Sequence, residues 1–156
     1  MKFWRISLLL VAVVLSGCVH SMRQVEVAAK GAEVMPFDLN KTTHIFEKLD
    51  NGGLQQVVVD ESGDIEQIAL IRQHLAEEAE RFAQGNFHDP SMIHGAAMPG
   101  LHELVMGAAN IAIAYSEIPA GGQILYTTDD SELVNAIHAW FDAQVSDHGA
   151  HAVDHR

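Results

Sequence analysis

The segment TTHIFEKLDNGGLQQVVV, residues 42–59, decides the fold, because it predicts two strands joined by a tight turn. Asn51-Gly52 lies between two apolar or alternating runs, and this dipeptide is a strong hairpin signal. A helix follows, predicted by apolar residues that recur at three- and four-residue steps and ending near Gly85. Those residues are Ile65, Ile68, Ile71, Leu75, Ala79 and Phe82. The segment and its continuation therefore predict a hairpin followed by an amphipathic helix.

The same order of elements recurs in the second half of the chain. Its predicted elements are a strand over Ile111–Glu117, a turn at residues 119–122, a strand over Gln123–Thr128 and a helix from Ser131 to about Val145. We therefore expect one α+β domain over residues 37–146, built from two β-hairpin-helix halves. Its strands should form an antiparallel sheet with the helices packed on one face.

Composition narrows the class of protein. With 48% hydrophobic and 19% charged residues, the chain has the composition of an ordinary globular domain. Lys and Arg total 9 against 21 Asp and Glu, a formal charge of -12. A nucleic-acid binder needs the opposite balance, so we do not expect nucleic acid as a partner. The ten histidines outnumber the basic residues, and imidazole is the commonest metal ligand.

The first 17 residues have the layout of a signal peptide. Two cations precede an apolar stretch over Ile6–Leu15, and small residues precede Cys18. The stretch is far shorter than the roughly 18 apolar residues of a membrane-spanning helix. Residues 15–18, LSGC, resemble the lipobox of bacterial lipoproteins, in which cleavage precedes the cysteine and its sulfur is lipidated. We therefore predict removal of residues 1–17 and lipidation of Cys18, with membrane attachment only through this lipid anchor.

The predicted mature protein is a strongly acidic protein of the bacterial cell envelope. In bacterial lipoproteins, Asp at the second mature position commonly retains the protein in the inner membrane. This chain has Val19 at that position, so by resemblance we predict sorting to the outer membrane, facing the periplasm. Loss of two cations with residues 1–17 leaves seven basic and 21 acidic residues, a formal charge of -14. Such a charge favours cations as partners. Residues 18–36 are predicted to be the lipidated cysteine and a tether, and residues 147–156 a His-rich tail.

Two predicted helices each carry a His followed four residues later by a carboxylate. The pairs are His74 with Glu78 and His138 with Asp142, and four-residue spacing puts each pair on one helix face. Taken alone, each pair is better explained as a local hydrogen bond on a solvated face. In two related halves the pairs could instead converge on one site.

The connector between the halves contains three His-Met pairs at four-residue spacing. They are His88 and Met92, His94 and Met98, and His102 and Met106. Imidazole with thioether suits copper, Cu(I) especially, and also haem iron, whereas calcium and magnesium prefer oxygen. Pro90 and Pro99 interrupt the segment, so the spacing does not guarantee a shared face. The loop over residues 93–101 is either a site loop or a structural turn.

The C-terminal segment carries His148, His151 and His155 at short spacing. Short His-rich tracts bind zinc, nickel and copper with little selectivity, because a flexible segment imposes no geometry. The segment is therefore a secondary metal site or a solvated terminus, unless it folds over the main site.

Five segments resemble a family of small bacterial proteins often labelled aspartate carbamoyltransferase. They are Pro36-Phe37-Asp38-Leu39, Ile68–His74, Ile93–Leu101, Tyr126-Thr127-Thr128 and Ala136–Asp142. The resemblance covers nearly everything after residue 36 and implies a shared fold and site. It does not imply the labelled activity, because the Ser-Thr-Arg-Thr phosphate loop and a second domain of about 150 residues are missing. Other enzyme signatures are missing too, although a metal-dependent hydrolase stays open.

The leading hypothesis is a lipid-anchored protein that binds a transition metal, copper before zinc, for sequestration or delivery, with the protein partner left open. Its predicted ligands are the imidazoles of His74, His94 and His138 and the thioether of Met98, with Glu78 and Asp142 orienting the imidazoles. One alternative is a module for haem or a small organic ligand, with a pocket formed by Tyr115, Trp140 and Phe141. Another is a structural lipoprotein that binds an envelope partner.

Overall fold

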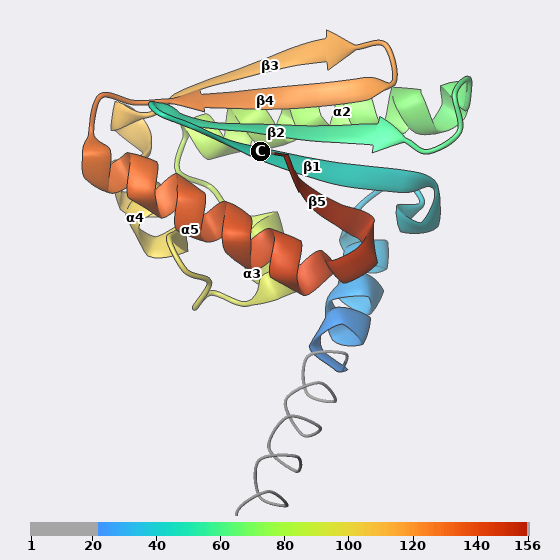
Figure 1. Ribbon diagram of the computed structural model, residues 1–156, viewed down its shortest axis with the longest axis horizontal. Helices are drawn as coiled ribbons and strands as arrows, with labels where there is room; N and C mark the ends of the chain where they lie inside the picture. The colour runs from blue at the N-terminus through green and yellow to red at the C-terminus, as the bar shows by residue number, and fades with distance from the viewer. Residues whose placement is uncertain (1–21, 156) are drawn as a thin grey trace, which may run out of the picture.

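The structure, a computed structural model, describes residues 22–155 of the chain. A five-stranded sheet in the order β3-β4-β2-β1-β5 forms one layer, and the helices cover one of its faces (Figure 1). The strands are β1 (Thr42–Leu49), β2 (Gly52–Val59), β3 (Ala112–Ile118), β4 (Gly121–Thr127) and β5 (Ala152–His155). This arrangement confirms the predicted α+β fold. The predicted signal peptide and the predicted lipidation of Cys18 lie outside the described residues.

The two predicted hairpins form and pair with each other. β1 pairs antiparallel with β2, β3 pairs antiparallel with β4, and the halves meet where β2 lies antiparallel to β4. Glycine is required at this junction, because a Cβ on Gly52 would lie 2.0 Å from the Tyr126 carbonyl oxygen. The hairpins therefore join into one continuous sheet.

The C-terminal segment was predicted as a tail, and this prediction is wrong. Helix α5 (Ser131–His148) continues to His148, a short 3-10 turn follows, and β5 then pairs parallel to β1. Gly149, with φ of 56°, ends the helix and turns the chain back toward the sheet. β5 satisfies the backbone groups along the open edge of β1. Because β5 runs parallel to β1, the sheet is mixed rather than wholly antiparallel.

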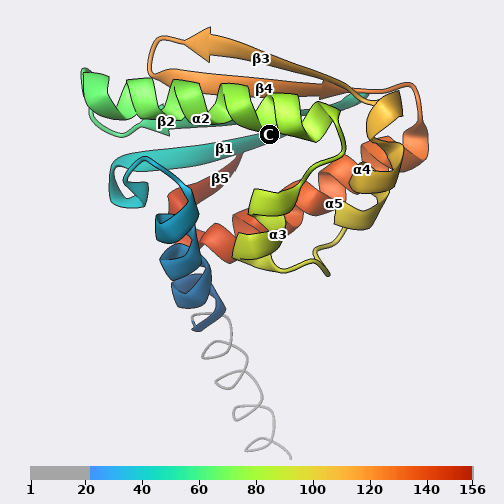
Figure 2. The same cartoon turned by 180° about the vertical axis from the view of Figure 1, so that it is seen from behind.

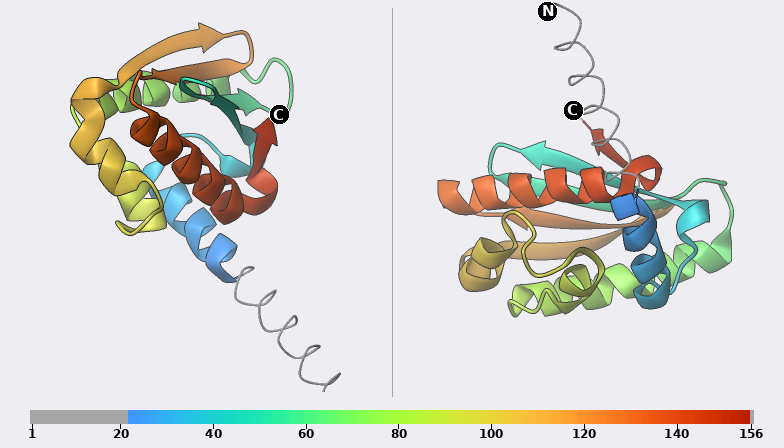
Figure 3. Two further views of the ribbon diagram at one scale, coloured as in Figure 1. Left: turned by 60° about the vertical axis from the view of Figure 1, so that its left-hand side comes forward. Right: turned by 90° about the horizontal axis from the view of Figure 1, so that it is seen from below.

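Helices α2 (Ile65–Ala83) and α5 both pack on the sheet, over different strands. Each begins at an aspartate whose carboxylate accepts a hydrogen bond from a backbone N–H of the first turn, Asp64 for α2 and Asp130 for α5. Helix α2 packs mainly on β3 and β4, and α5 on β1, β2 and β5. The short helices α3 (His88–His94) and α4 (Leu101–Gly107) lie below α2 in Figure 2, and Figure 3 shows them from two further sides. The sequence did not predict α3.

Residues 22–34 form a helix, so the predicted tether is wrong for this part of the chain. Val27 and Gly31, one helical turn apart, are buried, and a Cβ on Gly31 would lie 2.9 Å from the Leu39 side chain. The buried face escaped prediction because one of its positions is a glycine. Arg23 and Gln24 hydrogen-bond to the end of α5, which fixes this N-terminal helix against the domain.

The core lies between the sheet and the helices and is strongly aromatic. Its largest fully buried side chains include Phe46, Phe82, Tyr126, Trp140 and Phe141. Trp140 meets the rings of Phe82 and Tyr126 edge-on, at centroid distances of 6.0 and 5.8 Å. Among the described residues, no helix is long and apolar enough to cross a membrane.

Gly100 fixes how α4 packs on α5. Its φ is 76°, and a Cβ there would lie 2.1 Å from the Ala136 carbonyl oxygen. We expect Gly100→Ala to lower the free energy of unfolding by at least about 2 kcal/mol, because backbone strain and a steric clash add. Gly63→Ala is the matched control, since Gly63 has φ of 98° with nothing within 4 Å. Urea unfolding measures both variants, and equal losses would contradict the packing argument.

Candidate functional site

Three imidazoles from three distant segments meet inside the domain. His44 lies on β1, His94 ends α3 and His148 ends α5, and all three are buried, with exposed fractions of 3%, 5% and 6%. The rings of His44 and His148 stack at a centroid distance of 4.9 Å and an angle of 9°. The rings of His94 and His148 meet edge-on, also at 4.9 Å. We refer to these three residues as the histidine cluster.

Local structure explains why each ring points inward. His44 occupies the same face of β1 as the buried Thr42 and Phe46, since side chains alternate along a strand. β5 runs beside this strand and pairs Ala152 with His44. His94 is the last residue of α3, before Gly95 turns the chain with φ of 87°. The cluster therefore depends on the sheet edge and on the ends of two helices.

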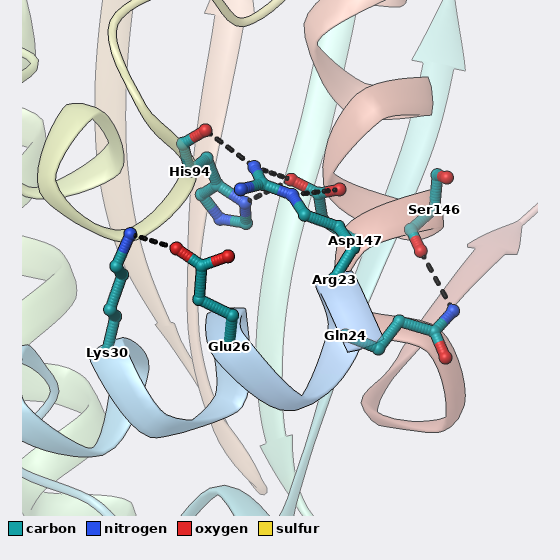
Figure 4. Close-up of polar contacts among 7 residues, drawn as sticks. All are labelled: Arg23, Gln24, Glu26, Lys30, His94, Ser146 and Asp147. Atoms are coloured by element: carbon teal, nitrogen blue, oxygen red, sulfur yellow. Dashed lines mark hydrogen bonds and ion pairs between the residues drawn. The ribbon is translucent and has the colours of Figure 1, made fainter. Parts of the chain in front are cut away.

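An ion pair anchors the histidine cluster (Figure 4). Arg23 donates from Nε and Nη2 to the two carboxylate oxygens of Asp147, at 3.1 and 2.6 Å, and from Nη2 to the His94 carbonyl oxygen at 2.5 Å. His94 Nδ1 lies 2.9 Å from Asp147 Oδ2. Although burial raises the pKa of Asp147, hydrogen bonds from Arg23 and His94 lower it overall. Because an ionised carboxylate only accepts, Nδ1 of His94 carries the proton and Nε2 the lone pair.

Each ring of the histidine cluster has a nitrogen without a hydrogen-bond partner in the described part of the chain. These atoms are His44 Nδ1, His94 Nε2 and His148 Nε2. Burial lowers the pKa of His44 to about 4 and lowers the pKa of His94 and His148 as well. The rings are therefore neutral at neutral pH. Buried polar atoms are rarely left unpaired, so this arrangement points to a missing partner.

A cavity of about 30 Å³, which we call the inner cavity, adjoins the histidine cluster. His44, His94, His74 and Glu78 are among the residues that line it. The Glu78 carboxyl group accepts a hydrogen bond from Arg81 Nη2 at 2.7 Å. Burial, followed by the nearby Asp89, raises the pKa of Glu78 to about 8, and Arg81 opposes the shift. Glu78 is therefore a buried carboxylic acid at neutral pH.

Three of the six predicted primary metal residues line this inner cavity, and three do not. His74, Glu78 and His94 are brought together, whereas Met98, His138 and Asp142 do not line the cavity. Met98 is buried in the hydrophobic core.

The two predicted His-carboxylate pairs do not converge. His138 Nε2 donates to the carbonyl oxygens of Leu49 and Gly52, at 3.0 and 2.9 Å, and thereby closes the β1–β2 turn. Asp142 instead pairs with Lys48. The second pair therefore serves the hairpin, whereas the first lines the inner cavity.

The predicted secondary ligands and the other His-Met pairs also divide between the histidine cluster and positions outside it. His148, predicted only as a secondary ligand, belongs to the histidine cluster, and the backbone of His151 hydrogen-bonds His44. The side chain of His155 lies outside the described residues. The other two His-Met pairs of the connector are exposed. Sequence reasoning missed His44, whose one signal was its position two residues from Thr42 and Phe46 on a predicted strand.

Comparison of the chain with protein-family models, with curated proteins and with solved structures found no match. The family resemblance of the sequence therefore stays a prediction. Within residues 22–155, no group of three or more His, Cys, Asp or Glu side chains is already arranged to hold a metal ion. Any metal at the histidine cluster therefore requires its rings to rotate.

His138 provides a test of the structural assignment. His138→Ala removes a hydrogen bond shared by two carbonyl groups, so we expect the free energy of unfolding to fall by about 1 kcal/mol. Urea unfolding checks the loss, and mass spectrometry of the intact protein checks metal retention, which we expect to be unchanged. Loss of metal in this variant would contradict the assignment.

Glu78 should give the protein a pH-dependent stability. Its folded pKa of about 8 exceeds the usual value of 4.5, so unfolding releases a proton between these limits and stability falls as pH rises. Relative to Glu78→Gln, we expect the free energy of unfolding to fall by about 1.4 kcal/mol per unit between pH 6 and 7, where the folded state keeps the proton and the unfolded state has lost it. Urea unfolding across this range measures the slope, and parallel curves for the two proteins would contradict the shifted pKa.

Proposed function

We propose that the protein is a lipid-anchored envelope protein that binds a transition metal, copper in preference to zinc, for sequestration or delivery. One observation carries this proposal: three buried, neutral imidazoles are in ring contact, and each has a ring nitrogen with no hydrogen-bond partner among the described residues. Neutral imidazole is the form that binds metal, and copper and zinc are among its usual partners.

The contacts of His94 support a ligand role. A metal-binding imidazole typically donates its second N–H to a carboxylate, which fixes the tautomer and the orientation of the ring. Asp147 holds His94 in this way, and Arg23 holds Asp147 from two nitrogen atoms. The Arg23–Asp147 ion pair therefore fixes the orientation of the His94 ring and the direction of its Nε2 lone pair.

The donor set favours copper over zinc. Three imidazole nitrogens suit either copper or zinc, so the preference rests on a soft donor. Thioether sulfur selects Cu(I), and Met35 lines the same inner cavity. Met35 therefore takes the soft-ligand role that the sequence had assigned to Met98.

Binding needs small ring movements. His44 and His148 lie nearly parallel, so the lone pairs in their ring planes do not converge on one point. Gly95 and Gly149 directly follow His94 and His148 and permit backbone adjustment there. Rotation of the side chains would bring two or three nitrogens onto one ion.

The inner cavity disfavours the haem alternative. Pockets that enclose drug-sized ligands usually measure about 300–1,000 Å³, whereas this cavity measures about 30 Å³. That volume suits a single ion or a water molecule. A haem would require the core around Trp140 to open.

Lipid attachment would keep the histidine cluster close to a membrane. Arg23 contacts the cluster and follows the predicted lipidated Cys18 by five residues. Five extended residues span at most about 18 Å. A metal bound there would stay within reach of membrane-associated partners.

The test measures metal retained by the unlipidated protein, residues 19–156, after exposure to equimolar Cu(I), Cu(II) and Zn(II) and desalting. We expect one copper per chain by mass spectrometry. We expect His94→Ala and His148→Ala to weaken Cu(I) binding at least about tenfold, and Asp147→Asn about 10- to 100-fold. His102→Ala is the matched control, since His102 is exposed on α4. No retained copper, or equal retention in all variants, would contradict the proposal.

A further inference from the structure

A larger hollow adjoins the inner cavity from the outside. It has a volume of about 250 Å³, and its lining includes His74, Glu77, Arg81 and Asp89. His74 and Asp89 also line the inner cavity. We call this larger space the outer hollow. His74 and Asp89 therefore form a wall shared by the outer hollow and the inner cavity.

His74 is the unusual residue of this wall. It is only 9% exposed on α2, and its ring makes no hydrogen bond within the described part of the chain. Its ring meets Phe37 edge-on at 5.7 Å, and Phe37 meets His44 at 5.9 Å. Phe37 thus lies between a histidine of the outer hollow and one of the histidine cluster. Burial lowers the pKa of His74, which keeps its ring neutral and able to bind a metal.

The charges around the outer hollow suit a cation. Arg81 donates a hydrogen bond to Glu78 and forms an ion pair with Asp89. The Glu77 carboxylate, among the contacts described, accepts only an amide hydrogen bond from Gln73. The outer hollow therefore keeps excess negative charge in a protein that is itself strongly acidic. Such a recess raises the local concentration of cations.

We infer that the outer hollow is the route by which the metal reaches the histidine cluster, with His74 as a transient ligand that passes the ion inward past Phe37. This inference rests on the proposed function. It assigns His74 a part in transfer rather than in holding the metal. The ring of Phe37, 3% exposed, keeps bulk water away from the cluster between transfers.

The experiment follows Cu(I) transfer between the protein and a chromophoric chelator by stopped-flow absorbance. We expect His74→Ala to slow loading and release about tenfold each while the dissociation constant changes less than about twofold, because a higher barrier slows both directions by the same factor. His74→Met retains a Cu(I) donor, so it should restore the rates. His102→Ala should behave as the wild type, and urea unfolding confirms that each variant is folded.

Two results would overturn the inference. Wild-type rates in His74→Ala would place the route elsewhere, and an affinity loss as large as that of His94→Ala would make His74 a permanent ligand. The proposed function fails separately, when the wild-type protein holds no copper at all. Wild-type protein that binds copper but does not depend on His74 for its rates would refute the transfer route alone.

Discussion

Arg23 and Asp147 form an ion pair between the N-terminal helix and α5, and the arrangement of the histidine cluster depends on it. Asp147 accepts from His94 Nδ1, and Arg23 neutralises that carboxylate while also holding the His94 backbone. An uncompensated carboxylate beside three buried rings would be costly. The pair therefore fixes one tautomer of His94, joins three distant segments of the chain and makes the N-terminal helix part of the site.

The sequence predicted those parts of the fold that rest on local signals. The Asn51-Gly52 turn, the alternation of β1 and the three- and four-residue periodicity of α2 predicted the first hairpin and its helix. The same order of elements in residues 111–145 predicted β3, β4 and α5. The C-terminal strand could not be predicted in this way. Its stability comes from the open edge of β1, a partner more than a hundred residues away in the chain.

The site was predicted in part. His94 and His74 were chosen from spacing and do line the inner cavity, whereas His138 satisfies the carbonyl groups of a turn. Four-residue spacing shows that two side chains share a helix face but not what that face meets. His44 and Arg23 carry no motif, because their roles arise only when β1, α3 and α5 pack together. Long-range packing, rather than any local pattern, therefore builds the histidine cluster.

X-ray absorption of the Cu(I)-loaded protein tests the central claim most directly, because it reports which atoms bind the metal. We expect two or three imidazole nitrogens and at most one sulfur around the ion, with the imidazole signal lost in the double variant His94→Ala and His148→Ala. A shell of oxygen atoms alone, or an unchanged imidazole signal in the double variant, would contradict a metal site at the histidine cluster.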